Sequence, residues 1–189
     1  MSVVTKKAAQ AQTISFDAPE MKETEEIIFS IGESDIGCVL VARTNAGICS
    51  ILMGANGDEL RGELSSRFPD SMLVRNDETV RSDLEKVTRL IATPSEPLDL
   101  PLDIRGTRFQ RRVWEALLTV RPGAVITYAA LARRIGEPNA VRAVAQACAN
   151  NPLAVAIPCH RVVRVDGALG GYRWGIERKR ALIKREALA

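Results

Sequence analysis

The sequence predicts a mixed α/β (α+β) fold in two lobes: a small N-terminal lobe with an antiparallel sheet and helices, then a mostly helical C-terminal lobe. Three observations predict it. Three β-rich runs precede two helical runs, a segment with three prolines spans residues 93–101, and short helical runs follow it. We expect residues 1–24 to form a flexible tail, residues 25–95 the N-terminal lobe and residues 96–189 the C-terminal lobe.

The β-rich runs cover residues 26–31, 36–43 and 47–53, and Gly, Asn and Asp residues separate them. This spacing predicts an antiparallel meander. Helices are expected over residues 58–68 and 76–92, because the second of these runs has apolar residues at helical spacing, namely Val80, Leu84, Val87 and Ile91.

The C-terminal lobe is expected to begin with a helix that Thr107 and Gln110 cap as a capping box. Two short helices, over residues 128–135 and 139–149, are joined by Gly136-Glu137-Pro138 and have helix-turn-helix character. Small side chains would let the second helix lie close to another surface, which could equally be a neighbouring helix. They are Ala140, Ala143, Ala145 and Ala147.

Beyond these helices, the sequence predicts a short apolar active-site strand over residues 153–157, which leads to Pro158 and Cys159. Asp166-Gly167 predicts a tight hairpin turn. A basic helix is expected from about residue 175, and it carries Arg178, Lys179, Arg180, Lys184 and Arg185.

Composition limits the classes of protein. The 189 residues are 46% hydrophobic and contain no apolar run of the roughly 18 residues that a membrane span needs. The N-terminus carries Lys6 and Lys7 before polar sequence, so we expect a cytoplasmic protein without a signal peptide. Four cysteines without CxxC spacing and a single histidine predict free thiols, no metal and no cofactor.

Charge is divided unevenly along the chain. Residues 1–100 hold 10 Lys and Arg against 17 Asp and Glu, whereas residues 101–189 hold 16 against 6. An excess of ten positive charges in the second part is typical of a polyanion-binding surface. A solvated basic face explains the same numbers equally well.

The best candidate for a reactive atom is the sulfur of Cys159, which stands next to the chain's single histidine, His160. A thiol reacts as thiolate, and a nearby imidazole can take its proton. Neighbours on a strand point to opposite sides, so either the chain turns sharply here or a water relays the proton. Glu186 could orient the imidazole. A buried, inert cysteine beside a core histidine is the structural alternative.

Five motifs, taken together and in this order, resemble the O6-alkylguanine-DNA alkyltransferase (methylated-DNA–protein-cysteine methyltransferase) family. The likeness runs from about residue 98 to 186 and is greatest to the C-terminal half of the bacterial Ada adaptive-response proteins. The motifs are Thr127-Tyr128-Ala129-Ala130, Ala140-Val141-Arg142-Ala143-Val144, Asn151-Pro152, Pro158-Cys159-His160-Arg161-Val162 and Gly171-Tyr172-Arg173-Trp174-Gly175.

The resemblance implies a role for each matching residue. Cys159 would accept the alkyl group, and His160, through a water, and Glu186 would generate its thiolate. Tyr128 would donate a proton toward N3 of the departing guanine and crowd the flanking phosphate. Arg142, with Ala143 beside it, would fill the gap left by a flipped nucleotide. Asn151 would brace the turn before the active-site strand. The remaining support and pocket residues are Pro158, Arg161, Val162, Tyr172, Arg173 and Trp174, and the bulk of the last two predicts poor reaction with free benzylated guanine.

The implied function is direct-reversal DNA repair. An alkyl group on O6 of guanine, and also on O4 of thymine, would pass irreversibly and once per molecule to Cys159 in a monomer bound to the minor groove of duplex DNA. Because the sequence has no likeness to the four-cysteine zinc domain of Ada, we expect a repair-only protein. Two alternatives stay open: a helix-turn-helix DNA-binding regulator with an inert cysteine, and a cysteine hydrolase that uses Cys159, His160 and Glu186.

Overall fold

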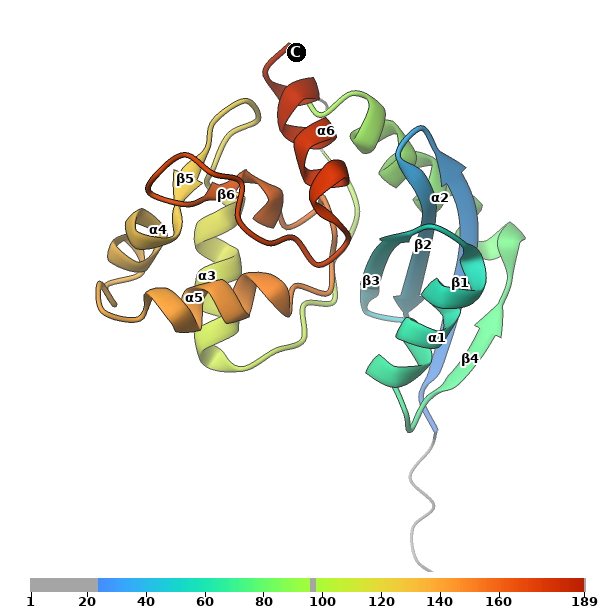
Figure 1. The fold of residues 1–189 in the computed structure, drawn as a ribbon. Coiled ribbons are helices and arrows are strands. Elements are labelled where there is room, and N and C mark those ends of the chain that lie inside the picture. The colour runs from blue at the N-terminus through green and yellow to red at the C-terminus, as the bar shows by residue number, and fades with distance from the viewer. Residues whose placement is uncertain (1–23, 96–97, 189) are drawn as a thin grey trace, which may run out of the picture.

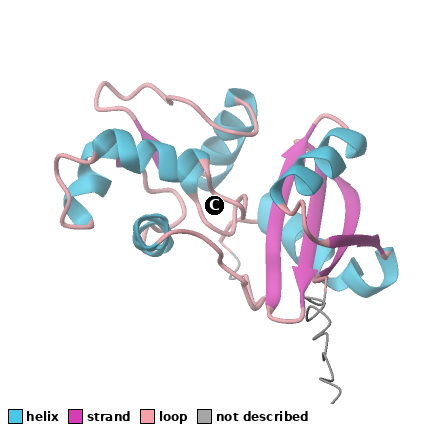
Figure 2. Ribbon diagram, turned by 90° about the horizontal axis from the view of Figure 1, so that it is seen from below, coloured by secondary structure: helices cyan, strands magenta, loops and turns pink. Residues whose placement is uncertain are grey.

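The computed structural model describes residues 24–95 and 98–188, so nearly all of the predicted tail lies outside the described residues. The α+β prediction is confirmed: a sheet with two helices precedes a mostly helical part (Figure 1). Figure 2 shows the long strands together on one side of the molecule and a mostly helical region on the other. We refer to residues 24–95 and 98–188 as the N-terminal and C-terminal lobes.

The sheet of the N-terminal lobe has the order β3-β2-β1-β4. The predicted antiparallel meander is confirmed by β1 (Glu26–Ser34), β2 (Gly37–Thr44) and β3 (Gly47–Gly54). A fourth strand, β4 (Met72–Arg75), pairs parallel with β1 and was not predicted. Its four residues are half-buried or exposed, so they carry no alternation that could have marked a strand.

Two helices cover this sheet. They are α1 (Gly57–Arg67) and α2 (Asp77–Ala92), and the side chains of Asn56 and Asn76 accept a hydrogen bond from the first turn of each. Asparagine at this position satisfies a backbone amide that the helix leaves free, which explains why each helix begins there. Helix α2 buries Val80, Val87 and Ile91, as its periodicity predicted.

The C-terminal lobe is built around α3 (Arg108–Leu118), whose predicted capping box between Thr107 and Gln110 forms. The indole of Trp114 donates a 2.9 Å hydrogen bond to the carbonyl of Ala147 and fixes α5 (Val141–Ala149) against α3. Helix α4 (Tyr128–Arg134) precedes α5. The chain ends with α6 (Ile176–Glu186).

The predicted helix-turn-helix is α4 and α5. Gly136 lies between them with φ of 76°, in the left-handed region that favours glycine. Arg112 on α3 donates to the carbonyl of Ile135 and pairs with Glu137 at 3.3 Å, so α3 supports the turn.

The strand predicted over residues 153–157 is wrong. Only Leu153 forms a bridge, with Ile51 of β3, and the chain then turns back on itself. The side chain of Asn151 accepts a hydrogen bond from the amide of Leu153 at 2.9 Å and donates one to the carbonyl of Ile157 at 2.8 Å. Val155 has φ of 58°, an uncommon value for a β-branched residue. An apolar run indicates burial, but it does not distinguish a buried strand from a buried turn.

The hairpin predicted at Asp166-Gly167 is also wrong, although the tight turn itself forms, with the amide of Arg164 donating to the carbonyl of Ala168 at 2.8 Å. No strand follows it among residues 168–175. Strand β6 (Val162–Val163) instead pairs parallel with β5 (Ile126–Thr127).

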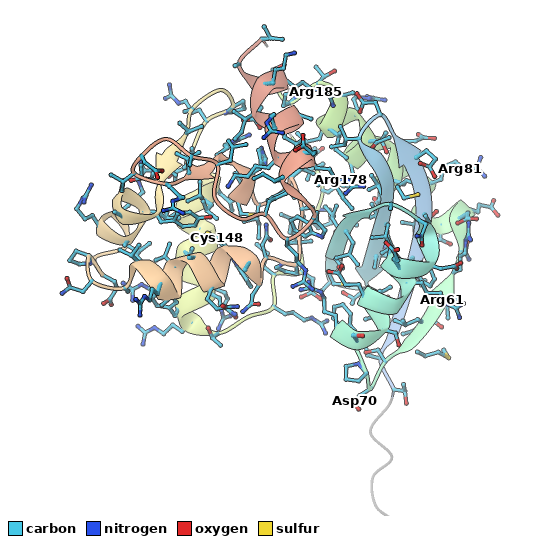
Figure 3. The ribbon with its side chains drawn as sticks, in the orientation of Figure 1. Arg61, Asp70, Arg81, Cys148, Arg178 and Arg185 are labelled. Atoms are coloured by element: carbon cyan, nitrogen blue, oxygen red, sulfur yellow. The ribbon has the colours of Figure 1, made fainter. Side chains whose placement is uncertain are left out.

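Helix α6 lies on the side of the C-terminal lobe that faces the N-terminal lobe (Figure 1). Arg178 donates to the carbonyls of Ile36 and Gly54 in the N-terminal lobe, at 2.7 and 2.6 Å. Arg185 donates to the carbonyl of Ile91 at 2.6 Å, and both arginines are labelled in Figure 3. Part of the positive excess of the C-terminal lobe therefore serves to hold the acidic N-terminal lobe, a use that the charge count did not indicate.

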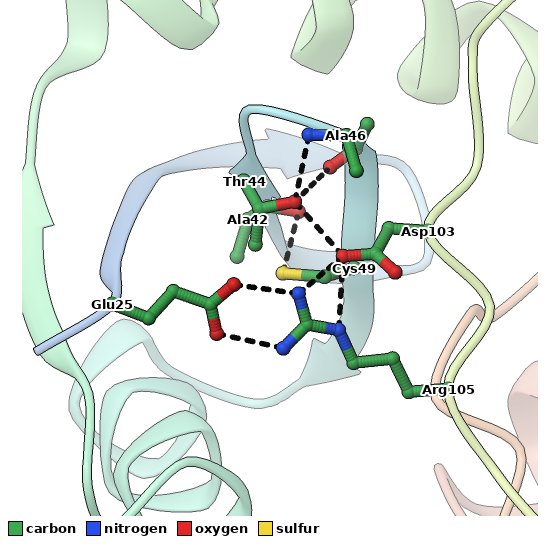
Figure 4. Close-up of polar contacts among 8 residues, drawn as sticks. Glu25, Ala42, Thr44, Ala46, Cys49, Asp103 and Arg105 are labelled. Carbon is green, nitrogen blue, oxygen red and sulfur yellow. Dashed lines mark hydrogen bonds and ion pairs between the residues drawn. The ribbon is translucent and has the colours of Figure 1, made fainter. Parts of the chain in front are cut away.

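The segment after the proline-rich connection is anchored in the same way. The guanidinium of Arg105 lies between the carboxylates of Glu25 and Asp103, and Asp103 also accepts a 2.9 Å hydrogen bond from Thr44 (Figure 4). Gly47 has φ of 144°, and a Cβ there would lie 2.4 Å from the carbonyl oxygen of Pro101. Edge strand β3 is thus covered by the C-terminal lobe.

Removing Arg178 should weaken the contact between the lobes. We expect Arg178→Ala to lower the free energy of unfolding by about 2–4 kcal/mol, because two hydrogen bonds from a charged donor to partly buried carbonyls are lost. Arg180→Ala is the matched control, since Arg180 pairs with the exposed Glu177 on the same helix and its loss should leave the free energy of unfolding almost unchanged. Urea unfolding of both variants measures the difference, and equal losses would contradict this account of α6.

Candidate active site

Cys159 lies at the start of the short 3-10 helix η1 (Cys159–Arg161), immediately after the turn that Asn151 closes. That turn is fixed to the sheet, because the amide of Ile51 donates to Pro152 at 2.9 Å and the carbonyl of Ile51 accepts from Ala154 at 3.0 Å. The N-terminal lobe therefore positions the loop that carries the sulfur. Cys159 is 4% exposed and borders a cavity of about 330 Å³, which is lined by Tyr128, Ala145, Cys148, Ala149, Cys159, Gly171, Tyr172 and Arg173.

Burial raises the pKa of Cys159 to about 11, because a thiolate is poorly solvated inside the protein. Two groups act in the opposite direction. The side-chain amide of Asn151 donates a 3.1 Å hydrogen bond to Sγ, and the nearby ammonium group of Lys179 favours the thiolate. Cys159 is thus a protonated thiol at neutral pH, and the Asn151 amide and the Lys179 ammonium group would stabilise its thiolate once it forms.

Behind the cysteine, His160, Arg161 and Glu186 form a buried network. Nε2 of His160 lies 2.7 Å from Oε1 of Glu186, and Arg161 donates to both oxygens of the same carboxylate at 2.9–3.1 Å. Burial alone would raise the pKa of Glu186, but the hydrogen bonds from His160 and Arg161 hold it at about 2. Burial lowers the pKa of His160, against the effect of Glu186.

These pKa directions fix the tautomer of His160. Since Glu186 is an ionised carboxylate and can only accept, Nε2 of the neutral imidazole carries the hydrogen. The lone pair is then on Nδ1, which is buried and makes no hydrogen bond to any described residue. His160 is therefore oriented as a base. The chain turns between Cys159 and His160, but no direct hydrogen bond joins their side chains among the described residues.

Lys179 is a candidate site residue that the sequence reasoning missed. It is 0% exposed, and its ammonium group donates to the carbonyls of Val162 at 2.5 Å, Leu169 and Gly171 at 3.3 Å. It ties β6 and the loop that follows it to α6, and it brings a positive charge near Cys159. The signal was present in the spacing, because Lys179, Leu182 and Glu186 share the buried face of α6.

The structure places two of the three aromatic candidates at the cavity. Tyr128 and Tyr172 line the cavity, and burial raises the pKa of Tyr128 to about 12, so its phenol is a donor at neutral pH. Trp174 does not line the cavity. It is 4% exposed and packs edge-on against Tyr172 with ring centroids 5.2 Å apart, so the bulk beside the cysteine comes from Arg173 and not from Trp174.

The remaining candidates divide between surface and core. Arg142 and Ala143 are exposed on α5, and Arg142 has no ion pair among the described residues. The same helix reaches the cavity at its other end, where Ala145, Cys148 and Ala149 line it, and Cys148 is labelled in Figure 3. Pro158 and Val162 are buried parts of the scaffold around η1.

Comparisons with known proteins agree with this geometry. The sequence profile described as "6-O-methylguanine DNA methyltransferase, DNA binding domain" matches residues 108–188. A methylated-DNA–protein-cysteine methyltransferase from Methanosarcina acetivorans is 35% identical over 158 residues, which cover 84% of this chain and 97% of that protein. The chain belongs to the methylated-DNA–protein-cysteine methyltransferase family.

Other members of the family are similar over different shares of their length. The bifunctional transcriptional activator/DNA repair enzyme Ada of Escherichia coli is 44% identical over 179 residues, 93% of this chain and 51% of Ada. The chain therefore spans about half the length of the Ada proteins it matches. The crystal structure of the Mycobacterium tuberculosis methyltransferase OGT in complex with DNA superposes with a TM-score of 0.72, at 32% identity over 86% of this chain and 93% of that chain.

Within residues 24–95 and 98–188, the helices are all too short or too polar to cross a membrane.

Proposed function

We propose that this chain repairs alkylated DNA directly, by transferring the alkyl group from O6 of guanine in duplex DNA to the sulfur of Cys159. The observation that carries the proposal is the buried Cys159 thiol at the cavity, with Asn151 donating to its sulfur and a correctly oriented His160 beside it. The printed names of the relatives, methylated-DNA–protein-cysteine methyltransferase and DNA repair enzyme Ada, support it.

The transfer balances without a cofactor. A sulfur–carbon bond forms as the bond between the alkyl carbon and O6 breaks, and the guanine departs with both electrons of that bond. Tyr128 supplies a proton to N3 of the departing base, which makes the base a better leaving group. The proton of the thiol passes to Nδ1 of His160 through an intervening water, because no hydrogen bond joins the two side chains among the described residues. Glu186 stabilises the imidazolium that results.

The exposed side of α5 is the proposed DNA surface. Its outward residues include Arg142, Ala143, Gln146 and Ala149, and the small ones allow the close approach that a minor groove requires. Arg142 would enter the base stack and offset the few kcal/mol that extrusion of a nucleotide costs. The flipped base would then lie in the cavity at the other end of α5.

The product explains a single turnover. A thioether has no good leaving group, and Cys148, the second thiol at the cavity, cannot displace an alkyl group from it. Burial also raises the pKa of Cys148 well above that of an ordinary thiol, which leaves it protonated and unreactive.

The lobe boundary near residue 95, the monomeric state and the cytoplasmic location stay predictions.

Peptide mapping after exposure to duplex DNA with one O6-methylguanine tests the proposal. We expect a mass increase of a single methyl group on the peptide with Cys159, none on the peptide with Cys148, and loss of the lesion in equal amount. A regulator with an inert cysteine would bind the duplex and stay unmodified. A cysteine hydrolase would instead turn over an ester repeatedly. The same assay with O4-methylthymine tests the second substrate.

A further inference from the structure

A second hollow lies next to the cavity that contains Cys159. It has a volume of about 420 Å³ and is lined by Glu63, Ser66, Arg67, Asn150 and Arg173. Arg173 lines both hollows and is the one residue that their linings share. Arg173 therefore lies at the boundary between the cysteine cavity and this neighbouring space.

The position of Arg173 depends on the N-terminal lobe. Its Nε donates to Oε1 of Glu63 on α1 at 2.8 Å, and its Nη1 donates to the carbonyl of Ala149 at the end of α5 at 3.3 Å. The side chains of Arg173 and Glu63 are 34% and 26% exposed, so water screens this ion pair only in part. The guanidinium thus reaches from the loop after Gly171 across to α5 and α1.

Glu63 also separates two like charges. Nη2 of Arg67, four residues further along α1, lies 3.3 Å from the same oxygen of Glu63. Burial lowers the pKa of Arg67, and the charge of Arg173 lowers it further, which indicates that the two guanidinium groups repel each other. Without the carboxylate between them, Arg173 has no partner on α1 and is pushed away from Arg67.

We propose that the Glu63–Arg173 ion pair sets the upper size of the alkyl group that reaches Cys159, with Glu63 as the positioning residue and Arg173 as the movable wall. This inference rests on the proposed alkyl transfer. With Arg173 in place, this residue forms a boundary that the cavity of about 330 Å³ shares with the second hollow. With Arg173 displaced, the two spaces join, and a bulky group on O6 gains room that a methyl group does not need.

Paired measurements of the transfer rate test whether Arg173 limits the size of the alkyl group. Single-turnover transfer is measured from two duplexes that differ only in carrying O6-methylguanine or O6-benzylguanine, and the ratio of the benzyl to the methyl rate is compared between proteins. We expect Glu63→Gln and Arg173→Ala each to raise this ratio by up to about fivefold, the upper end of the effect of losing a partly exposed ion pair. Glu59→Gln is the matched control, an exposed carboxylate on α1 that forms no ion pair among the described residues.

A charge swap separates positioning from general damage to the fold. In the double variant Glu63→Arg with Arg173→Glu, the new carboxylate faces two arginines and the ion pair should re-form. A carboxylate cannot donate to the carbonyl of Ala149, so the ratio should fall below that of either single variant without reaching the parent value. A ratio that stays within about twofold of the parent in both single variants, or a double variant whose ratio is no lower than theirs, overturns the inference while methyl transfer continues. If the parent protein transfers neither group, the proposed function itself fails.

Discussion

A Cys159→Ser protein is expected to leave O6-methylguanine in duplex DNA unrepaired while binding that duplex as the parent does. The hydroxyl has nearly the shape of the thiol, and Asn151 can still donate to it. An alcohol is a much weaker nucleophile than a thiol, and His160 cannot ionise it in advance. We expect transfer to fall by more than about a thousandfold, with DNA affinity within about twofold of the parent.

Cys148→Ser is the matched control for this result. Cys148 borders the same cavity and is also buried, but it has no amide donor comparable to Asn151 and its pKa is raised further by burial. We expect the Cys148 variant to transfer methyl at a rate within about threefold of the parent, since only the wall of the cavity changes. Repair by the Cys159 variant, or a methyl group found on Cys148 of the parent, would contradict the assignment of the acceptor.

Much of the fold follows from local sequence signals. The meander, the capping box before α3 and the two short helices each depend on residues close together in the chain, and the structure has all of them. The reactive pair Cys159 and His160 was also visible locally. By contrast, β4 exists because it pairs with β1 some 45 residues earlier, and its own residues show no strand pattern.

The parts of the candidate site that sequence reasoning missed depend on distant contacts. Lys179 appeared to be one more cation on a basic helix, but three backbone carbonyls allow it to be buried. Glu63 lies 110 residues from Arg173 and comes near the cavity only because the two lobes pack together. The turn at residues 151–157 was mistaken for a strand because the side chain that closes it, Asn151, lies outside the apolar run.

Replacing Glu186 with glutamine should affect both rate and stability. The variant keeps the shape but loses the charge that orients Nε2–H of His160 and that pairs with Arg161. We expect single-turnover methyl transfer to fall by roughly a hundredfold or more, because the imidazole can adopt the wrong tautomer and its cation is no longer stabilised. A loss of less than about threefold would show that Glu186 does not assist the cysteine.

The stability effect has a definite dependence on pH. The pKa of Glu186 is about 2 in the folded protein against an ordinary value of 4.5, so the folded state favours the ionised carboxylate. At about 1.4 kcal/mol per pKa unit, this shift contributes about 3 kcal/mol, fully present above pH 4.5 and lost as the pH falls through 2. Urea unfolding should therefore show the largest difference in the free energy of unfolding between parent and Glu186→Gln near pH 7, and a smaller difference below pH 4.5.

The matched control is Glu177→Gln, which changes an exposed carboxylate on the same helix. Its free energy of unfolding should differ little from that of the parent at either pH. A difference between parent and Glu186→Gln that stays constant from pH 7 to 3 would mean that burial, and not the charge of Glu186, determines its contribution.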